Sequence, residues 1–94
     1  MATEAQIEKL VASHGARVRS VGKHHVDVEI ETPTASRASL AISLTERRFD
    51  GLGFNPQGWT EAKFLSTTSA MLQLISLAHD LWDLCNVRDT EIAC

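Results

Sequence analysis

The chain has 94 residues, a formal net charge of −3 and 44% hydrophobic residues. This length allows one domain with a thin core, and the composition is typical of a folded globular chain rather than a disordered one. The 12 acidic residues outnumber the 9 basic ones, which argues against the electrostatic footprint of a nucleic-acid-binding protein. We therefore expect a single domain over residues 1–94, with frayed ends at 1–2 and 87–94.

The N-terminal residues MATEAQIEKL contain no apolar run, so they do not predict a secretory signal peptide. The apolar stretch 70–85 is shorter than a membrane span and is interrupted by polar and charged side chains. These features predict a cytoplasmic protein. In a reducing compartment, Cys85 and Cys94 do not form a disulfide framework, and Cys85 is expected to be a small buried hydrophobe.

The first predicted element is a short helix that begins after Thr3. Thr3 and Gln6 have the spacing of a capping box, in which each side chain satisfies a free backbone N–H of the first turn. Gly15 follows His14 and is a natural left-handed stop. The helix carries one narrow apolar face, formed by Ile7, Leu10 and Val11.

Two strands should follow, at 16–21 and 24–31. The second alternates with a period of two, so one face holds Val26, Val28 and Ile30. The acidic side chains Asp27, Glu29 and Glu31 then point to the other face, toward solvent.

The register of this hairpin follows from its charges. A two-residue turn would place arginines on the apolar face, so we favour a three-residue loop at 22–24. That loop sets Arg17 opposite Glu29 and Arg19 opposite Asp27 on the solvent side. Opposite charges directly across a ladder stabilise the pairing weakly. Val18 then faces Val28 inside the hairpin.

A third strand is predicted after the connector that begins at Pro33. Its inward positions are Ala38, Leu40, Ile42 and Leu44. An Asp50-Gly51 turn and an irregular stretch at 52–59 then lead to Thr60, which can cap the next helix.

The last predicted element is one long helix, from Thr60 to about Cys85. Its polar stripe consists of Ser69, Gln73, Ser76, His79, Asp80 and Asp83. Apolar side chains cover the rest of the circumference: Phe64, Met71, Leu74, Ile75, Leu77, Ala78, Leu81, Trp82, Leu84 and Cys85. This apolar arc is roughly twice the 100° that one core requires. Part of it is therefore expected to meet a second surface.

The predicted fold is α+β: a short helix, a three-stranded antiparallel meander and a long helix, with both helices on the apolar face of the sheet. This order resembles the topology of double-stranded-RNA-binding domains. That family holds phosphates through a lysine cluster at the N-terminus of its last helix, and the resemblance would imply binding to duplex RNA. Here residues 60–63 carry one lysine beside Glu61, so the resemblance stops at topology.

Catalytic and metal-binding patterns are weak in this sequence. His24 and His25 are adjacent on a strand and point to opposite faces, and His79 with Asp83 supplies only two metal ligands. Cys85 and His79 project from opposite sides of the long helix, and no glycine-rich phosphate loop is present. We expect no enzyme, no cofactor and no metal.

The predicted contact surface is a line along the long helix, with Trp82 as its anchor. It comprises Phe64, Met71, Ile75, Ala78 and Trp82, and we expect it to form a homodimer or a partner interface. A secondary contact is predicted at Arg47, Arg48 and Phe49.

These features favour a small non-enzymatic interaction module that acts by steric binding to another protein or protein complex, alone or as a homodimer. Inhibitors of phage or bacterial type, such as anti-CRISPR or immunity proteins, and adaptors have this physical profile. A nucleic-acid-associated module with the RNA-binding-like topology is the alternative. A dimeric small-molecule pocket protein or enzyme is the third hypothesis.

Overall fold

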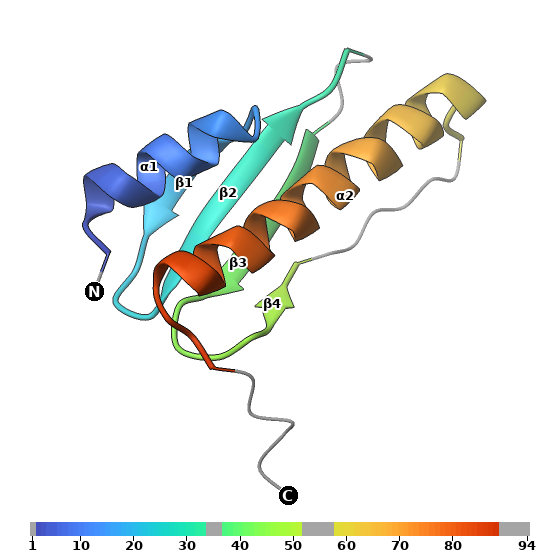
Figure 1. Ribbon diagram of the computed structural model, residues 1–94. Coiled ribbons are helices and arrows are strands. Elements are labelled where there is room, and N and C mark those ends of the chain that lie inside the picture. Colours follow the sequence, from blue (N-terminus) through green and yellow to red (C-terminus); the bar gives the residue numbers. More distant parts are fainter. Residues whose placement is uncertain (1, 34–36, 52–57, 89–94) are drawn as a thin grey trace, which may run out of the picture.

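The computed structural model describes residues 2–33, 37–51 and 58–88 of the chain (Figure 1). Its elements follow the order α1 (Glu4–Ser13), β1 (Arg17–Val21), β2 (His25–Glu31), β3 (Arg37–Ser43), β4 (Phe49–Asp50) and α2 (Glu61–Leu84). The predicted α+β order is confirmed, with one short strand added before α2.

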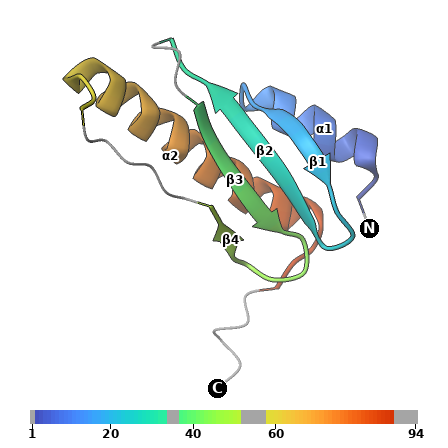
Figure 2. The same cartoon turned by 180° about the vertical axis from the view of Figure 1, so that it is seen from behind.

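The strands form one antiparallel sheet in the order β1-β2-β3-β4. Both helices lie on the same face of this sheet, side by side (Figure 1). The view from behind shows the other face of the sheet without a covering helix (Figure 2). The predicted two-layer arrangement is therefore confirmed.

The prediction of three strands was incomplete because β4 pairs with the end of β3. Ile42 lies opposite Phe49, and Ala41 lies opposite Asp50. Gly51 follows with a φ of 82°, a left-handed conformation that glycine adopts without a Cβ clash. Asp50 of the predicted Asp-Gly turn thus belongs to a two-residue strand, which is too short to give an alternation signal.

The caps of both helices match their sequence signals. Thr3 accepts a hydrogen bond from the Gln6 N–H at 3.1 Å, and the Gln6 side chain accepts one from the Thr3 N–H at 2.8 Å. Gly15 has the predicted positive φ, 75°. At the start of α2, the Thr60 side chain accepts from the Lys63 N–H at 3.2 Å.

The register of the first hairpin is partly as predicted. Arg17 lies opposite Glu29 and Val18 opposite Val28, but a β-bulge at Arg19 shifts the pairing after Val18. The predicted pairing of Arg19 with Asp27 is therefore wrong. Ser20 takes the place opposite Asp27 and donates a hydrogen bond to its carboxylate at 2.8 Å.

The loop of this hairpin has the predicted three residues, 22–24, although the bulge shifts the pairing next to it. Val21 lies opposite Val26, and the turn between them is closed by the Gly22 N–H, which donates to the His25 carbonyl at 2.8 Å. A Cβ on Gly22 would lie 2.4 Å from the His25 ring, so only glycine fits there without a shift of that ring. Because the bulge adds one residue to β1, Val21 lies on the same apolar face as Val18.

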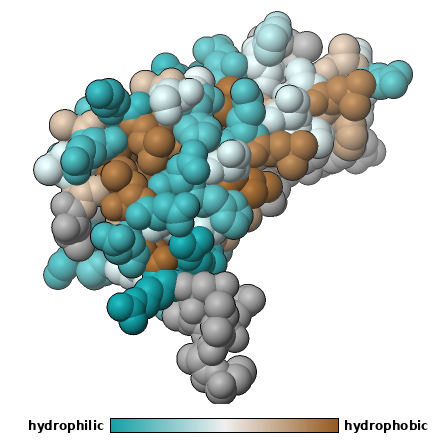
Figure 3. Space-filling view, viewed as in Figure 1, coloured by the Kyte–Doolittle hydropathy of each residue, from teal (hydrophilic) through white to brown (hydrophobic). Residues whose placement is uncertain are grey.

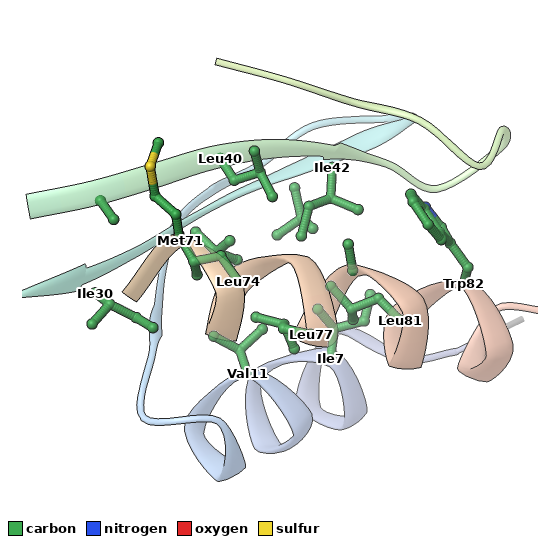
Figure 4. Packing of buried hydrophobic residues seen from close by; sticks show 14 of the residues in the cluster. Ile7, Val11, Ile30, Leu40, Ile42, Met71, Leu74, Leu77, Leu81 and Trp82 are labelled. Atoms are coloured by element: carbon green, nitrogen blue, oxygen red, sulfur yellow. The ribbon is translucent and has the colours of Figure 1, made fainter. Parts of the chain in front are cut away.

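The core lies between the sheet and the two helices (Figure 4). The strands contribute the inward residues that their alternation predicts, namely Val26, Val28, Ile30, Ala38, Leu40 and Ile42. Helix α1 adds Ile7 and Val11. Helix α2 contributes the largest share: Thr67, Ala70, Met71, Leu74, Leu77, Ala78, Leu81 and Trp82.

The C-terminal end of α2 is fixed by a Schellman motif. Asn86 has a φ of 56°, its N–H donates to the Asp83 carbonyl, and the Val87 N–H donates to the Trp82 carbonyl at 2.8 Å. Val87 is itself buried against the core. The chain is therefore ordered through Val87, and the rest of the tail predicted to fray, 89–94, lies outside the described residues.

Candidate interaction surfaces

Most of the predicted interface line lies inside the chain's own core. Met71 is 6% exposed, Ala78 is fully buried and Trp82 is 3% exposed, all three facing the sheet. Ile75 is half-buried and Phe64 is 40% exposed. Only these last two residues of the line are accessible to another molecule in this structure.

Trp82 joins α2 to the strands by a polar and an aromatic contact. Its Nε1–H donates to the Ser43 carbonyl at 2.9 Å, and its ring stacks on Phe49 with the centroids 6.2 Å apart. The His79 ring approaches Trp82 edge-on at 5.0 Å. A buried tryptophan whose N–H has a partner is a favourable core residue. Trp82 is therefore a core residue of the single chain.

The predicted secondary contact is divided between the interior and the surface. Arg47 donates from Nε to the Val87 carbonyl at 2.9 Å and from Nη2 to Asp83 at 2.8 Å. Its guanidinium carbon also lies 5.7 Å from the Trp82 ring centroid. Arg47, between β3 and β4, and Phe49, in β4, thus both contact the C-terminal end of α2. Arg48 remains exposed and forms an ion pair with Glu46 at 2.9 Å.

The accessible apolar surface lies instead on the outward side of the first half of α2. Leu72 is 62% exposed and Leu65 is 58% exposed, which makes them the most exposed large hydrophobic residues of the described chain. Figure 3 shows hydrophobic surface along this part of α2. No Asp, Glu, Lys or Arg occurs from Phe64 to Ala78, so the surface around the two leucines is uncharged. We call Leu65, Thr68, Leu72 and Ile75 the outer seam of α2.

Sequence reasoning missed Leu65 and Leu72 because the apolar arc of α2 was taken as one continuous band. The two leucines are seven residues apart and fall among Ser69, Ser76 and His79, within the polar stripe. Residues seven apart in a helix lie on nearly the same side, so the two leucines form an apolar strip within the polar stripe. That spacing was the signal for a second apolar strip, separate from the core-facing one.

A hollow lies on the uncovered face of the sheet. Its volume is about 570 Å³, and it is lined by His24, His25, Asp27, Ala41, Ser43, Thr45, Glu46, Arg48 and Asp50. The register places Ala41 between Asp27 and Asp50, on neighbouring strands. This lining includes acidic side chains, an arginine and histidines, so its charges do not define one class of ligand.

A smaller cavity of about 180 Å³ lies at the end of the core beside Cys85. It is lined by Ala2, Glu4, Ile7, Val21, Gly22, Lys23, His24, Leu44, Thr45 and Cys85. Burial raises the pKa of the Cys85 thiol above its usual value, an effect that the nearby N-terminal charge opposes. Since the thiolate is the reactive form, this environment disfavours a nucleophilic cysteine.

The histidines and acidic residues of the described chain do not gather into a metal site. Within residues 2–33, 37–51 and 58–88, no three His, Cys, Asp or Glu side chains are placed to hold a metal ion. His14 Nε2 lies 2.7 Å from Asp80 Oδ2, and Asp83, one of the two ligands considered in the sequence, forms an ion pair with Arg47. Over the same residues, no helix is long and apolar enough to cross a bilayer.

No protein-family model, curated protein or solved structure matches this chain.

Proposed function

We propose that this chain is a small non-enzymatic interaction module that works by steric contact with another protein in the cytoplasm. An inhibitor that blocks a surface, of the phage or bacterial type that includes anti-CRISPR and immunity proteins, or an adaptor, would act in this way. The observation that carries the proposal is the outer seam of α2, where Leu65 and Leu72 are exposed within an uncharged surface.

The physical reason is the free energy that these side chains gain on burial. Removing a leucine side chain from water stabilises the buried state by about 1.5–3 kcal/mol. The neighbours on the same face, Thr68, Ser69 and Ser76, are small and uncharged, so a partner that covers them desolvates no charge. Interface centres have this composition, in which charged residues are depleted.

The alternative of nucleic-acid binding receives less support from the charge distribution. Lys63, the one lysine of the first turn of α2, lies over the Trp59 ring at 4.7 Å and has Glu61 beside it. On the open face of the sheet, Arg17 and Arg19 both face Glu29, which neutralises part of their charge. A phosphate backbone is held by clustered, uncompensated basic residues.

Affinity capture from the source cell tests this proposal. The wild-type chain, a Leu65→Glu/Leu72→Glu double variant and a Gln73→Glu control are tagged and compared. Gln73 is exposed next to Leu72 but outside the outer seam, so the control adds the same charge without altering the seam.

We expect a partner protein that the wild-type and control chains retain and the double variant loses. Equal capture by all three chains would contradict the proposed surface. Retention that disappears after nuclease treatment would support the nucleic-acid alternative instead.

A further inference from the structure

The outer seam of α2 has the spacing of one side of a coiled coil. Its four residues, Leu65, Thr68, Leu72 and Ile75, are separated by three, four and three residues. This is the a-d-a-d pattern through which two helices interlock their side chains. Glu61 and His79 continue the same pattern by one position at each end, and both are exposed. The seam is therefore bounded by one acidic and one imidazole side chain.

We propose that the occupant of this seam is a second copy of the chain, with the two α2 helices packed antiparallel about a two-fold axis at the level of residue 70. This inference rests on the proposed function, since it assigns the partner of the same surface. In this register Leu65 packs on Ile75 of the second copy, and Thr68 packs on its Leu72. Each contact occurs twice because the interface is isologous.

The charges of α2 select this orientation and register. The antiparallel pair places Glu61 of one copy opposite His79 of the other at both ends, where a carboxylate meets an imidazole ring that can donate a hydrogen bond to it. It also sets the two helix dipoles in opposite directions. A parallel pair would instead bring Glu61 against Glu61.

Other antiparallel registers leave the seam incomplete. Moving the axis by half a heptad toward the N-terminus places Leu72 opposite Glu61. Moving it by half a heptad the other way places Leu65 opposite Trp82, which is already buried against the sheet. Only the axis at residue 70 pairs the four seam residues with one another.

The size of the contact predicts a weak dimer. The overlap from Glu61 to His79 is about 27 Å long at a rise of 1.5 Å per residue, and each copy contributes a single helix. Interfaces of this extent belong to the small, transient class. We expect a dissociation constant on the order of tens of micromolar.

Sedimentation equilibrium of the full chain over a range of concentrations tests the pairing. We expect a reversible monomer–dimer equilibrium for the wild-type chain and for the Gln73→Glu control. Leu72→Glu should remain monomeric while keeping its circular dichroism spectrum, because Leu72 is mostly exposed in the monomer. A wild-type chain that is still monomeric at about 1 mM, or a Leu72→Glu variant that dimerises like the wild type, would overturn the proposal.

Disulfide trapping tests the orientation. Cys85 and Cys94 are first replaced by serine. Copies that carry Thr68→Cys are then mixed with copies that carry Leu72→Cys, and the mixture is oxidised. The antiparallel register predicts a dominant mixed dimer. Two Leu72→Cys copies are separated by about 6 Å along the axis as well as by the distance between the helices, which is too far for a disulfide. Dominant cross-linking between two Leu72→Cys copies would show a parallel pair and overturn the register.

The two sets of experiments separate this inference from the proposed function. If the wild-type chain is monomeric but the Leu65→Glu/Leu72→Glu variant still loses a partner protein, the dimer is refuted. The proposed function as an interaction module then stands. If the wild-type chain dimerises but its seam variants capture the same proteins as the wild type, the pairing stands. The outer seam of α2 is then not the surface that binds the partner protein.

Discussion

The two halves of α2 belong to one continuous helix but have different surroundings. The C-terminal half is packed on several sides. Helix α1 lies beside it, and Trp82 donates a hydrogen bond to the Ser43 carbonyl of β3. Arg47, between β3 and β4, donates a hydrogen bond to Asp83 near its end. The N-terminal half packs on the sheet along one side and exposes Leu65 and Leu72 on the other. A helix that spans the whole sheet can thus stabilise the monomer at one end and offer a contact surface at the other.

The largest effect is expected from truncating a side chain of the C-terminal half. Trp82→Ala removes the stacking on Phe49 and leaves the Ser43 carbonyl without its donor. Loss of a buried aromatic of this size lowers the free energy of unfolding by about 3–5 kcal/mol. Urea denaturation followed by circular dichroism measures the loss. A Trp82→Ala chain as stable as the wild type would mean that the C-terminal half of α2 does not stabilise the monomer more than the N-terminal half does.

A smaller effect is expected at Arg47, which contacts α2 only near its end. Arg47→Ala removes hydrogen bonds to the Val87 carbonyl and the Asp83 carboxylate. We expect a loss of about 1–2 kcal/mol, since the side chain is partly exposed and solvent screens the ion pair. The matched control is Arg48→Ala, which removes an exposed pair with Glu46 and should change the midpoint of thermal unfolding very little.

The N-terminal cap of α2 provides a test of the open half itself. Thr60→Ala removes the acceptor of the Lys63 N–H, which should lower stability by about 1 kcal/mol. Amide hydrogen exchange should rise mainly in the first turn of α2 and remain slow around Leu81. Faster exchange over the whole helix would indicate that the two halves unfold together.

The smallest effect on stability is expected at the outer seam. Leu72→Ala removes a side chain that is already 62% exposed, and alanine is the best helix former, so the change should lie within about 0.5 kcal/mol. The same substitution should weaken self-association measurably in sedimentation experiments. A loss of stability comparable to that of Trp82→Ala would place Leu72 in the core and remove the distinction between the two halves.

Signals within a few residues predicted their structures well. The capping box of Thr3 and Gln6, the cap at Thr60 and the alternation of Val26, Val28 and Ile30 all depend on neighbours in the sequence. Their physics is local, because each is a backbone hydrogen bond within one turn or a side-chain period of two. This is why the order of the predicted elements and the inward faces of β2 and β3 were correct.

The features that sequence reasoning missed depend on contacts between distant segments. The pairing of Phe49 with Ile42, the hydrogen bond from Arg47 to Val87 and the position of Trp82 against β3 appear only once α2 is placed on the sheet. The periodicity of α2 indicated an excess of apolar surface. It did not indicate which part of that surface the sheet would cover, because this depends on the width of the sheet and the position of α1.

The bulge at Arg19 has a consequence for how copies of the chain can avoid uncontrolled association. β1 is an edge of the sheet, and an edge strand exposes backbone groups to which another strand can add. The extra residue at Arg19 breaks the regular spacing of those groups and increases the local twist, while Arg17 and Arg19 place two guanidinium groups along the strand. Growth of the sheet from chain to chain, the geometry of a fibril, is therefore disfavoured at β1.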